Sequence, residues 1–119
     1  MNKRHKKLRV WGESIRLVEI LYRISELLPS SEKFGLISQM KRASVSIPSN
    51  IAEGAARQHR KELLHFCSIA RGSLSELDTQ IELCLRLAFL SPNDVIPLLS
   101  QMEAVDSLLS GLIRSLKNS

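Results

Sequence analysis

Residues 98–116 read LLSQMEAVDSLLSGLIRSL, and large apolar side chains recur along them at intervals of four, three, four, three and four residues. The residues of this seam are Leu98, Met102, Val105, Leu109, Leu112 and Leu116. Intervals that alternate between three and four place side chains on one face of an α-helix, the face by which helices pack together. The stretch therefore predicts a helix over residues 95–117 whose apolar face is buried in a bundle.

Three earlier segments carry the same periodicity and predict helices over residues 8–28, 32–57 and 60–90. The stripe of the first segment consists of Leu8, Trp11, Ile15, Val18, Tyr22 and Leu28, and Leu17, Leu21 and Ile24 widen it. Short joints between four helices favour antiparallel neighbours. We therefore expect an all-α protein, an antiparallel up-down four-helix bundle formed by residues 8–119, preceded by a basic arm of residues 1–7.

The second predicted helix contains a proline within its apolar pattern. Pro48 lacks a backbone N–H and its ring clashes with the preceding turn. We therefore expect a kink in this helix, or a break and restart near Ser46.

The end of the third predicted helix is apolar nearly all round. Residues 81–90 read IELCLRLAFL, and these side chains cannot all face one core. A second apolar face indicates a partner chain, so we expect the bundle to form a homo-oligomer.

Composition restricts the class of protein. A chain of 119 residues forms one domain, and no stretch approaches the length of a membrane span. The amino-terminal residues lack the apolar core of a secretory signal, so we expect a cytoplasmic protein without membrane contact. Cys67 and Cys84 lie inside apolar runs, which predicts buried, reduced thiols.

The positive charge is concentrated in two segments. The formal net charge is +5, and residues 1–9 contain cations without any acid. A second group of cations flanks the second predicted helix. The candidate nucleic-acid-binding residues are Lys3, Arg4, Lys6, Lys7, Arg9, Lys41, Arg42, Arg57, Arg60 and Lys61. Such cations bind phosphates without reading sequence, although solubilising tails and solvated helix faces have the same composition.

The sequence contains no recognisable catalytic motif. Glu62 and His65 have the Glu-x-x-His spacing of di-iron bundles, but those bundles need two copies and here there is one. We therefore predict no enzyme activity, no catalytic residue, no metal site and no cofactor. Four polar residues beside apolar positions form a candidate structural network: Asn50, Glu53, Arg71 and Glu76. A polar pocket is the alternative interpretation.

Two sequence blocks resemble a known family. Residues 39–54 read QMKRASVSIPSNIAEG, and residues 66–77 read FCSIARGSLSEL. Both are similar to the four-helix-bundle family encoded in intervening sequences of 23S ribosomal RNA genes. Trp11, residues 32–36 and residues 110–117 also fit, so the resemblance covers nearly the whole chain.

The resemblance implies a homopentameric ring. It also implies kinship with the accessory variability determinant of diversity-generating retroelements, which binds nucleic acid and a reverse transcriptase. Our first hypothesis is a non-enzymatic, oligomeric accessory protein that binds RNA or DNA through its basic residues. The alternative is a protein-protein interaction scaffold, such as a reverse-transcriptase accessory subunit, without direct nucleic-acid binding. A metal-dependent enzyme built on Glu62 and His65 is a third hypothesis.

Overall fold

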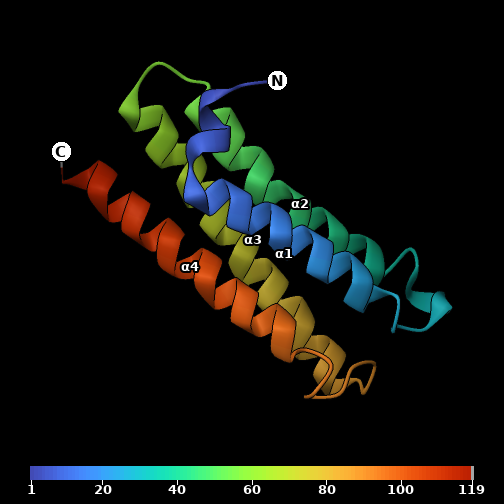
Figure 1. Cartoon of the computed structure of the whole chain (residues 1–119). Helices are drawn as coiled ribbons and strands as arrows, with labels where there is room; N and C mark the ends of the chain where they lie inside the picture. Colours follow the sequence, from blue (N-terminus) through green and yellow to red (C-terminus); the bar gives the residue numbers. More distant parts are fainter. Residues whose placement is uncertain (119) are drawn as a thin grey trace.

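The computed structural model describes residues 1–118 and contains four α-helices (Figure 1). The helices are α1 (Arg9–Ser25), α2 (Leu36–Ala55), α3 (Arg60–Arg86) and α4 (Ile96–Lys117), with two short 3₁₀ segments, η1 (Arg4–Lys7) and η2 (Ser30–Glu32). Residues 1–118 contain no strand, and the molecule measures 45 × 26 × 19 Å. The prediction of an all-α four-helix bundle is confirmed. Within the same residues, no helix combines the length and the apolar character needed to cross a bilayer.

Each helix packs against two others. α1 contacts α2 and α4, and α3 contacts the same two helices from the other side, so one core runs between all four. Figure 1 shows the α2–α3 joint at the end of the bundle where the N-terminus lies, and the other two joints at the opposite end. Residues far apart in the sequence are thereby brought together at each end.

The apolar seam of α4 faces the core for most of its predicted length. Leu98, Met102, Val105 and Leu109 are buried, and then Ile113 takes the place of Leu112 on the buried face. A straight helix repeats every 3.6 residues, so a strict heptad pattern drifts around it. The shift by one residue after two heptads has this cause.

The buried face of α1 differs from the predicted one. Leu17 and Leu21 are fully buried, whereas Ile15 is 36% exposed and Tyr22 is 41% exposed. The residues that we expected only to widen the stripe form the core face. Of the predicted main stripe, Leu28 beyond the end of α1 is buried, and we call four residues that lie at the rim of the bundle the outer stripe of α1: Trp11, Ile15, Val18 and Tyr22.

Two buried serines hide the true core face of α1 from sequence reading. Ser14 Oγ donates a hydrogen bond to the carbonyl oxygen of Trp11 at 2.7 Å, and Ser25 Oγ donates to that of Tyr22 at the same distance. A hydroxyl that bonds to its own helix can be buried at low cost. These serines therefore occupy core positions that a periodicity of apolar residues leaves empty.

The second helix begins later than predicted and does not break. It begins at Leu36, whose N–H donates to Glu32 Oε1 at 3.1 Å, so Glu32 satisfies the helix end from outside the helix. α2 then continues through Pro48, which is buried. The restart near Ser46 that we considered is not observed.

The third helix ends at Arg86, four residues before the predicted end. Ala88 has a φ of 61°, in the left-handed region, and the N–H of Phe89 donates to the carbonyl oxygen of Cys84 at 2.9 Å. The apolar run is thereby divided. Leu90 folds back into the core, whereas Leu83 and Leu87 remain 44% and 55% exposed.

The close contact between α2 and α3 depends on Gly54. A Cβ atom at Gly54 would lie 2.8 Å from Phe66 Cβ and 3.2 Å from Leu63 Cα, whereas one at Gly72 would meet nothing within 4 Å. Both glycines lie inside helices, where alanine is otherwise preferred. Because Gly54 faces atoms that cannot turn away, the two positions should respond to alanine in opposite directions.

We predict that Gly54→Ala lowers the free energy of unfolding by about 1–3 kcal/mol through overpacking. Gly72→Ala is the matched control and should raise it by about 0.5–1 kcal/mol through helix propensity. Urea denaturation, monitored by circular dichroism, measures both free energies of unfolding. A Gly54→Ala variant at least as stable as the parent would show that the contact is not tight.

Candidate functional site

The amino-terminal arm lies on the bundle. Segment η1 packs on α1 and α2, and Arg4 Nη2 donates a hydrogen bond to the carbonyl oxygen of Arg57 at 3.2 Å. The ring centroids of His5 and Trp11 lie 5.0 Å apart in an edge-to-face arrangement. These contacts place the arm beside the last turn of α2.

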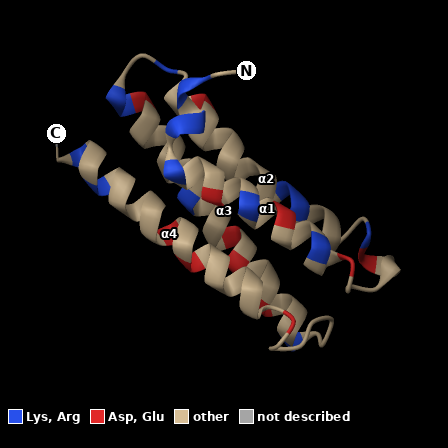
Figure 2. Cartoon of the chain, viewed as in Figure 1, with Lys and Arg blue, Asp and Glu red and all other residues tan. Residues whose placement is uncertain are grey.

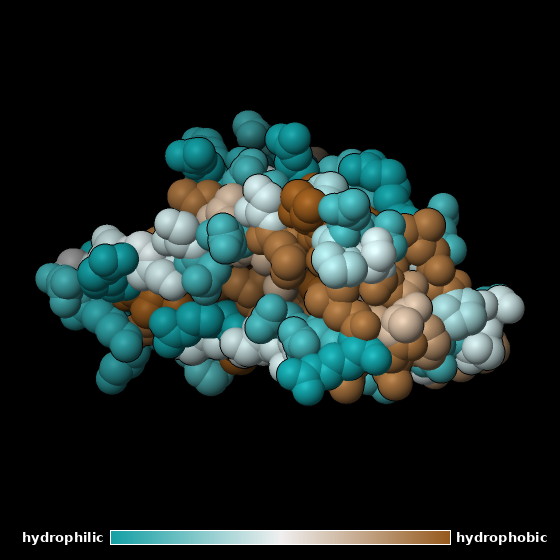
Figure 3. All heavy atoms as spheres, turned by 90° about the horizontal axis from the view of Figure 1, so that it is seen from below, coloured by the Kyte–Doolittle hydropathy of each residue, from teal (hydrophilic) through white to brown (hydrophobic). Residues whose placement is uncertain are grey.

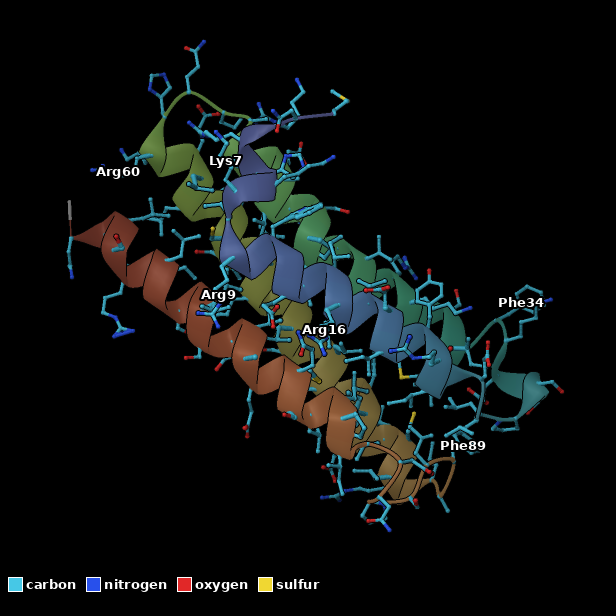
Figure 4. All side chains as sticks on the ribbon, in the orientation of Figure 1. Lys7, Arg9, Arg16, Phe34, Arg60 and Phe89 are labelled. Carbon is cyan, nitrogen blue, oxygen red and sulfur yellow. The ribbon has the colours of Figure 1, made fainter. Side chains whose placement is uncertain are left out.

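The arm and the α2–α3 joint form one basic surface, which we call the basic end. Lys3, Arg4 and Lys6 line a pocket together with Arg57, and Arg4 lines a second pocket with Arg60. Figure 4 shows Lys7 and Arg60 at this end, and Phe34 and Phe89 at the opposite one. The basic end consists of Lys3, Arg4, Lys6, Lys7, Arg57, Arg60 and Lys61, and Arg9 borders it at the start of α1, where Figure 4 shows it away from Lys7 and Arg60.

Two further cations lie near the basic end and were not among the predicted residues. Arg114 and Lys117 are in the last turn of α4, and Leu116 from the same turn lines a pocket with Arg4 and Arg60. This turn is far from the arm in the sequence, and the fold brings the two together. A signal was available, because the last helix of an up-down bundle ends where its first helix begins.

Arg57 differs from its neighbours because its guanidinium group is already occupied. It lies 3.3 Å from Glu53 Oε1 and 4.0 Å from Glu62 Oε2, and its Cζ lies 5.2 Å from the ring centroid of Phe66. These contacts join the end of α2 to the start of α3. Arg57 therefore holds the joint together, and its charge is partly neutralised.

The other cations of the basic end carry uncompensated charge. Within residues 1–118, neither Arg60, Lys61, Arg9 nor any cation of the arm forms an ion pair with a carboxylate. Lys6, Lys7, Arg9, Arg60 and Lys61 are exposed. Uncompensated, exposed cations gathered on one end of a protein attract polyanions.

Lys41 and Arg42 are separated from the basic end. Lys41 Nζ lies 4.6 Å from the ring centroid of Tyr22, in the last turns of α1, so the two cations belong to the far half of the bundle. Most of α2 lies between Lys41 and Arg57, a rise of about 24 Å along the helix axis. The structure therefore does not place Lys41 and Arg42 in one patch with the cations of the α2–α3 joint.

Within residues 1–118, no hydrogen bond or ion pair joins the four residues predicted as a polar network to one another. Asn50 Nδ2 donates to the carbonyl oxygen of Ser46 at 2.7 Å, Glu53 pairs with Arg57, and Glu76 Oε2 accepts from Gln80 Nε2 at 3.2 Å. Arg71 has neither a hydrogen-bond nor an ion-pair partner for its side chain in residues 1–118. A polar link between the middles of α2 and α3 is instead the hydrogen bond between the hydroxyls of Ser46 and Ser73.

The two cysteines and His65 are packed against other side chains of the bundle. Cys67 and Cys84 are free and buried as predicted, and burial raises the pKa of the Cys67 thiol to about 11. Burial, and then the charge of Glu32, raise the pKa of Cys84. His65 packs edge-to-face on Phe66 at 5.5 Å. Among residues 1–118, no three His, Cys, Asp or Glu side chains are grouped to hold a metal ion.

The half of the bundle away from the arm is acidic along α3 and α4. Asp78, Glu103 and Asp106 line a pocket of about 310 Å³ between these helices, with Leu74, Leu99 and Met102 as its apolar part. Figure 2 shows acidic residues along this part of α3 and α4, and blue residues both at the amino-terminal end and along α1 and α2. The acidic surface therefore lies on α3 and α4, apart from the basic end.

This chain is similar to a known protein family. A family model described as 23S rRNA-intervening sequence protein matches residues 6–111 of this chain. The matched range includes α1, α2 and α3 entirely and most of α4. A search of curated proteins found no match.

Proposed function

The chain belongs to the family of 23S rRNA-intervening sequence proteins, and from this premise we propose that it is a non-enzymatic, oligomeric accessory protein that binds RNA or DNA. Binding occurs through the basic end, whose cations contact phosphates. The observation that carries the proposal is the convergence of the arm with the α2–α3 joint on one surface. Contacts of this kind position a protein on nucleic acid without selecting a sequence.

The electrostatics of the basic end support phosphate binding over a purely solubilising role. A solubilising tail works equally well wherever it points, but this arm is held against α2 by Arg4. Arg4 thereby lines one pocket with Arg60, so the charges of the arm and of the α2–α3 joint add at this surface. In a symmetric oligomer the same surface is repeated, which strengthens the field at each copy.

We predict steep dependence of this binding on salt. The logarithm of the association constant should fall with the logarithm of salt concentration by about 0.9 for each phosphate contact to duplex, so a site with six contacts loses about a thousandfold between 50 and 200 mM salt. Fluorescence anisotropy with labelled RNA and DNA duplexes of unrelated sequences measures this slope. Absence of binding at about 20 mM salt, where phosphate contacts are strongest, would refute the proposed function.

Self-association is part of the proposal. The outer stripe of α1 borders a shallow groove of about 290 Å³ with Val45, Pro48 and Ala52 from α2. Figure 3 shows apolar side chains over much of the face of the molecule that it displays. An apolar surface of this kind is typical of a subunit contact. An antiparallel order of the helices, a bend of α2 at Pro48 and a pentameric ring belong to the same proposal, and light scattering of the purified protein measures the subunit number.

A protein scaffold, such as an accessory subunit of a reverse transcriptase, is the second candidate function. The acidic pocket between α3 and α4 favours it, because Asp78, Glu103 and Asp106 surround an apolar centre that suits a basic, amphipathic segment. Replacement of the three acids by their amides separates the two functions. Loss of a protein partner without loss of nucleic-acid binding would assign the scaffold role to this pocket.

A further inference from the structure

The pocket under the arm has two chemically different parts. It has a volume of about 660 Å³, and it is lined on one side by Lys3, Arg4, His5 and Lys6 of the arm. Its other side is the end of α2, where Ala52 and the following Ala56 expose methyl groups without hydrogen-bonding atoms and Ala55 is almost wholly buried, and Met1 adds a further apolar side chain to the lining. A phosphate alone needs only the cations. The apolar alanine surface calls for a ligand that also has a flat, weakly polar part.

The arm is held in a position that keeps this pocket open. Arg4 Nη2 donates a hydrogen bond to the carbonyl oxygen of Arg57, which lies just beyond the end of α2. This hydrogen bond holds the arm at the rim of the pocket. At the other end of the arm, the N–H of Leu8 donates to the carbonyl oxygen of His5 at 3.0 Å, and the His5 ring packs on Trp11. The pocket is therefore made by contacts within one chain.

The size and lining fit one nucleotide unit of a single strand. Pockets of about 300–1,000 Å³ hold small organic ligands, and a nucleotide combines a phosphate with a planar base. In a duplex the bases are paired and stacked inside, so only phosphates reach a protein surface of this shape. In a single strand an unpaired base is free to leave its neighbours and cover apolar side chains.

We propose that the pocket between the arm and α2 binds a phosphate and its adjoining unpaired base, and so makes the protein prefer single-stranded over double-stranded nucleic acid. This inference rests on the proposed function, because the cations that hold the phosphate belong to the basic end. Alanine methyl groups do not discriminate among base edges. Gln58, at the rim, is the lining residue other than His5 with both a donor and an acceptor for a base. Sequence preference is accordingly weak.

The test fills the pocket without changing any charge. Ala56 is exposed and lines the pocket, so Ala56→Leu adds bulk there without an aromatic face on which a base could stack, and Ser107→Leu on the exposed surface of α4 is the matched control. The probes are a labelled single-stranded RNA of about 12 nucleotides, within the usual size range of such sites, and an RNA duplex of the same length. Both are compared by fluorescence anisotropy at one salt concentration. Circular dichroism verifies that both variants fold.

The parent should bind the single strand at least about tenfold more tightly than the duplex, a difference typical of one well-placed base contact. Ala56→Leu should remove this preference and leave duplex binding within about twofold, whereas Ser107→Leu should change neither. Equal losses for both probes, or an unchanged preference, would overturn the pocket proposal and leave phosphate binding intact. Failure of the parent to bind either probe would instead refute the proposed function itself.

Discussion

Substitution of glutamine for Lys6, Lys7, Arg60 and Lys61 together is expected to weaken nucleic-acid binding by about two to three orders of magnitude near 0.1 M salt. These four cations are exposed and form no ion pair within residues 1–118, so their charge is available to phosphates. For duplex, the salt-dependence slope should also decrease by about 0.9 for every cation that no longer binds a phosphate. Anisotropy titrations of the parent and the variant at several salt concentrations measure both quantities.

A matched variant distinguishes a site from net charge. Glutamine at Arg16, Arg23, Lys41 and Arg42 removes the same number of charges from the part of the bundle away from the arm. Figure 4 shows Arg16 along α1, away from Lys7 and Arg60. This control should lose less than about tenfold in affinity, because distant charges are screened over a Debye length of about 10 Å. Equal losses in the two variants would mean that net charge, and no particular surface, attracts the nucleic acid.

The sequence predicted part of the basic end because charge clustering is visible without a fold. The arm cations lie close together in the sequence, and so do Arg57, Arg60 and Lys61. What the sequence could not show is which clusters meet. Lys41 and Arg42 seemed to belong with Arg57 because one predicted helix carries them all, but the length of that helix is what separates them.

The bundle was predictable because four separate segments share one periodicity. Which face of each helix is buried was harder to predict. Periodicity identifies the apolar positions of α1, but two apolar stripes lie side by side on that helix. Choosing between them requires knowing that Ser14 and Ser25 satisfy their hydroxyls within the helix. The end of α3 was also hidden, because Ala88 adopts a left-handed φ that favours glycine.

The difference between the predicted and the observed buried face of α1 leads to a second large effect. Leu17→Ala is expected to lower the free energy of unfolding by about 3–5 kcal/mol, because Leu17 is fully buried and its truncation leaves a cavity among apolar neighbours. Ile15→Ala removes a side chain of the same size from the middle of the stripe that sequence alone would place in the core. Because Ile15 is 36% exposed, this substitution should cost less than about 1.5 kcal/mol in the separated protomer.

Protein concentration must be controlled in this comparison, because binding between copies adds to apparent stability. At dilutions where the protein is a single protomer, urea denaturation should show Leu17→Ala to be well below Ile15→Ala in stability. If the outer stripe of α1 is a subunit contact, Ile15→Ala should raise the protein concentration needed for assembly. The difference in stability between the parent and Ile15→Ala should then grow with protein concentration. The opposite order at high dilution would mean that α1 is rotated about its axis, and the groove beside Val45 and Pro48 would then lose its role.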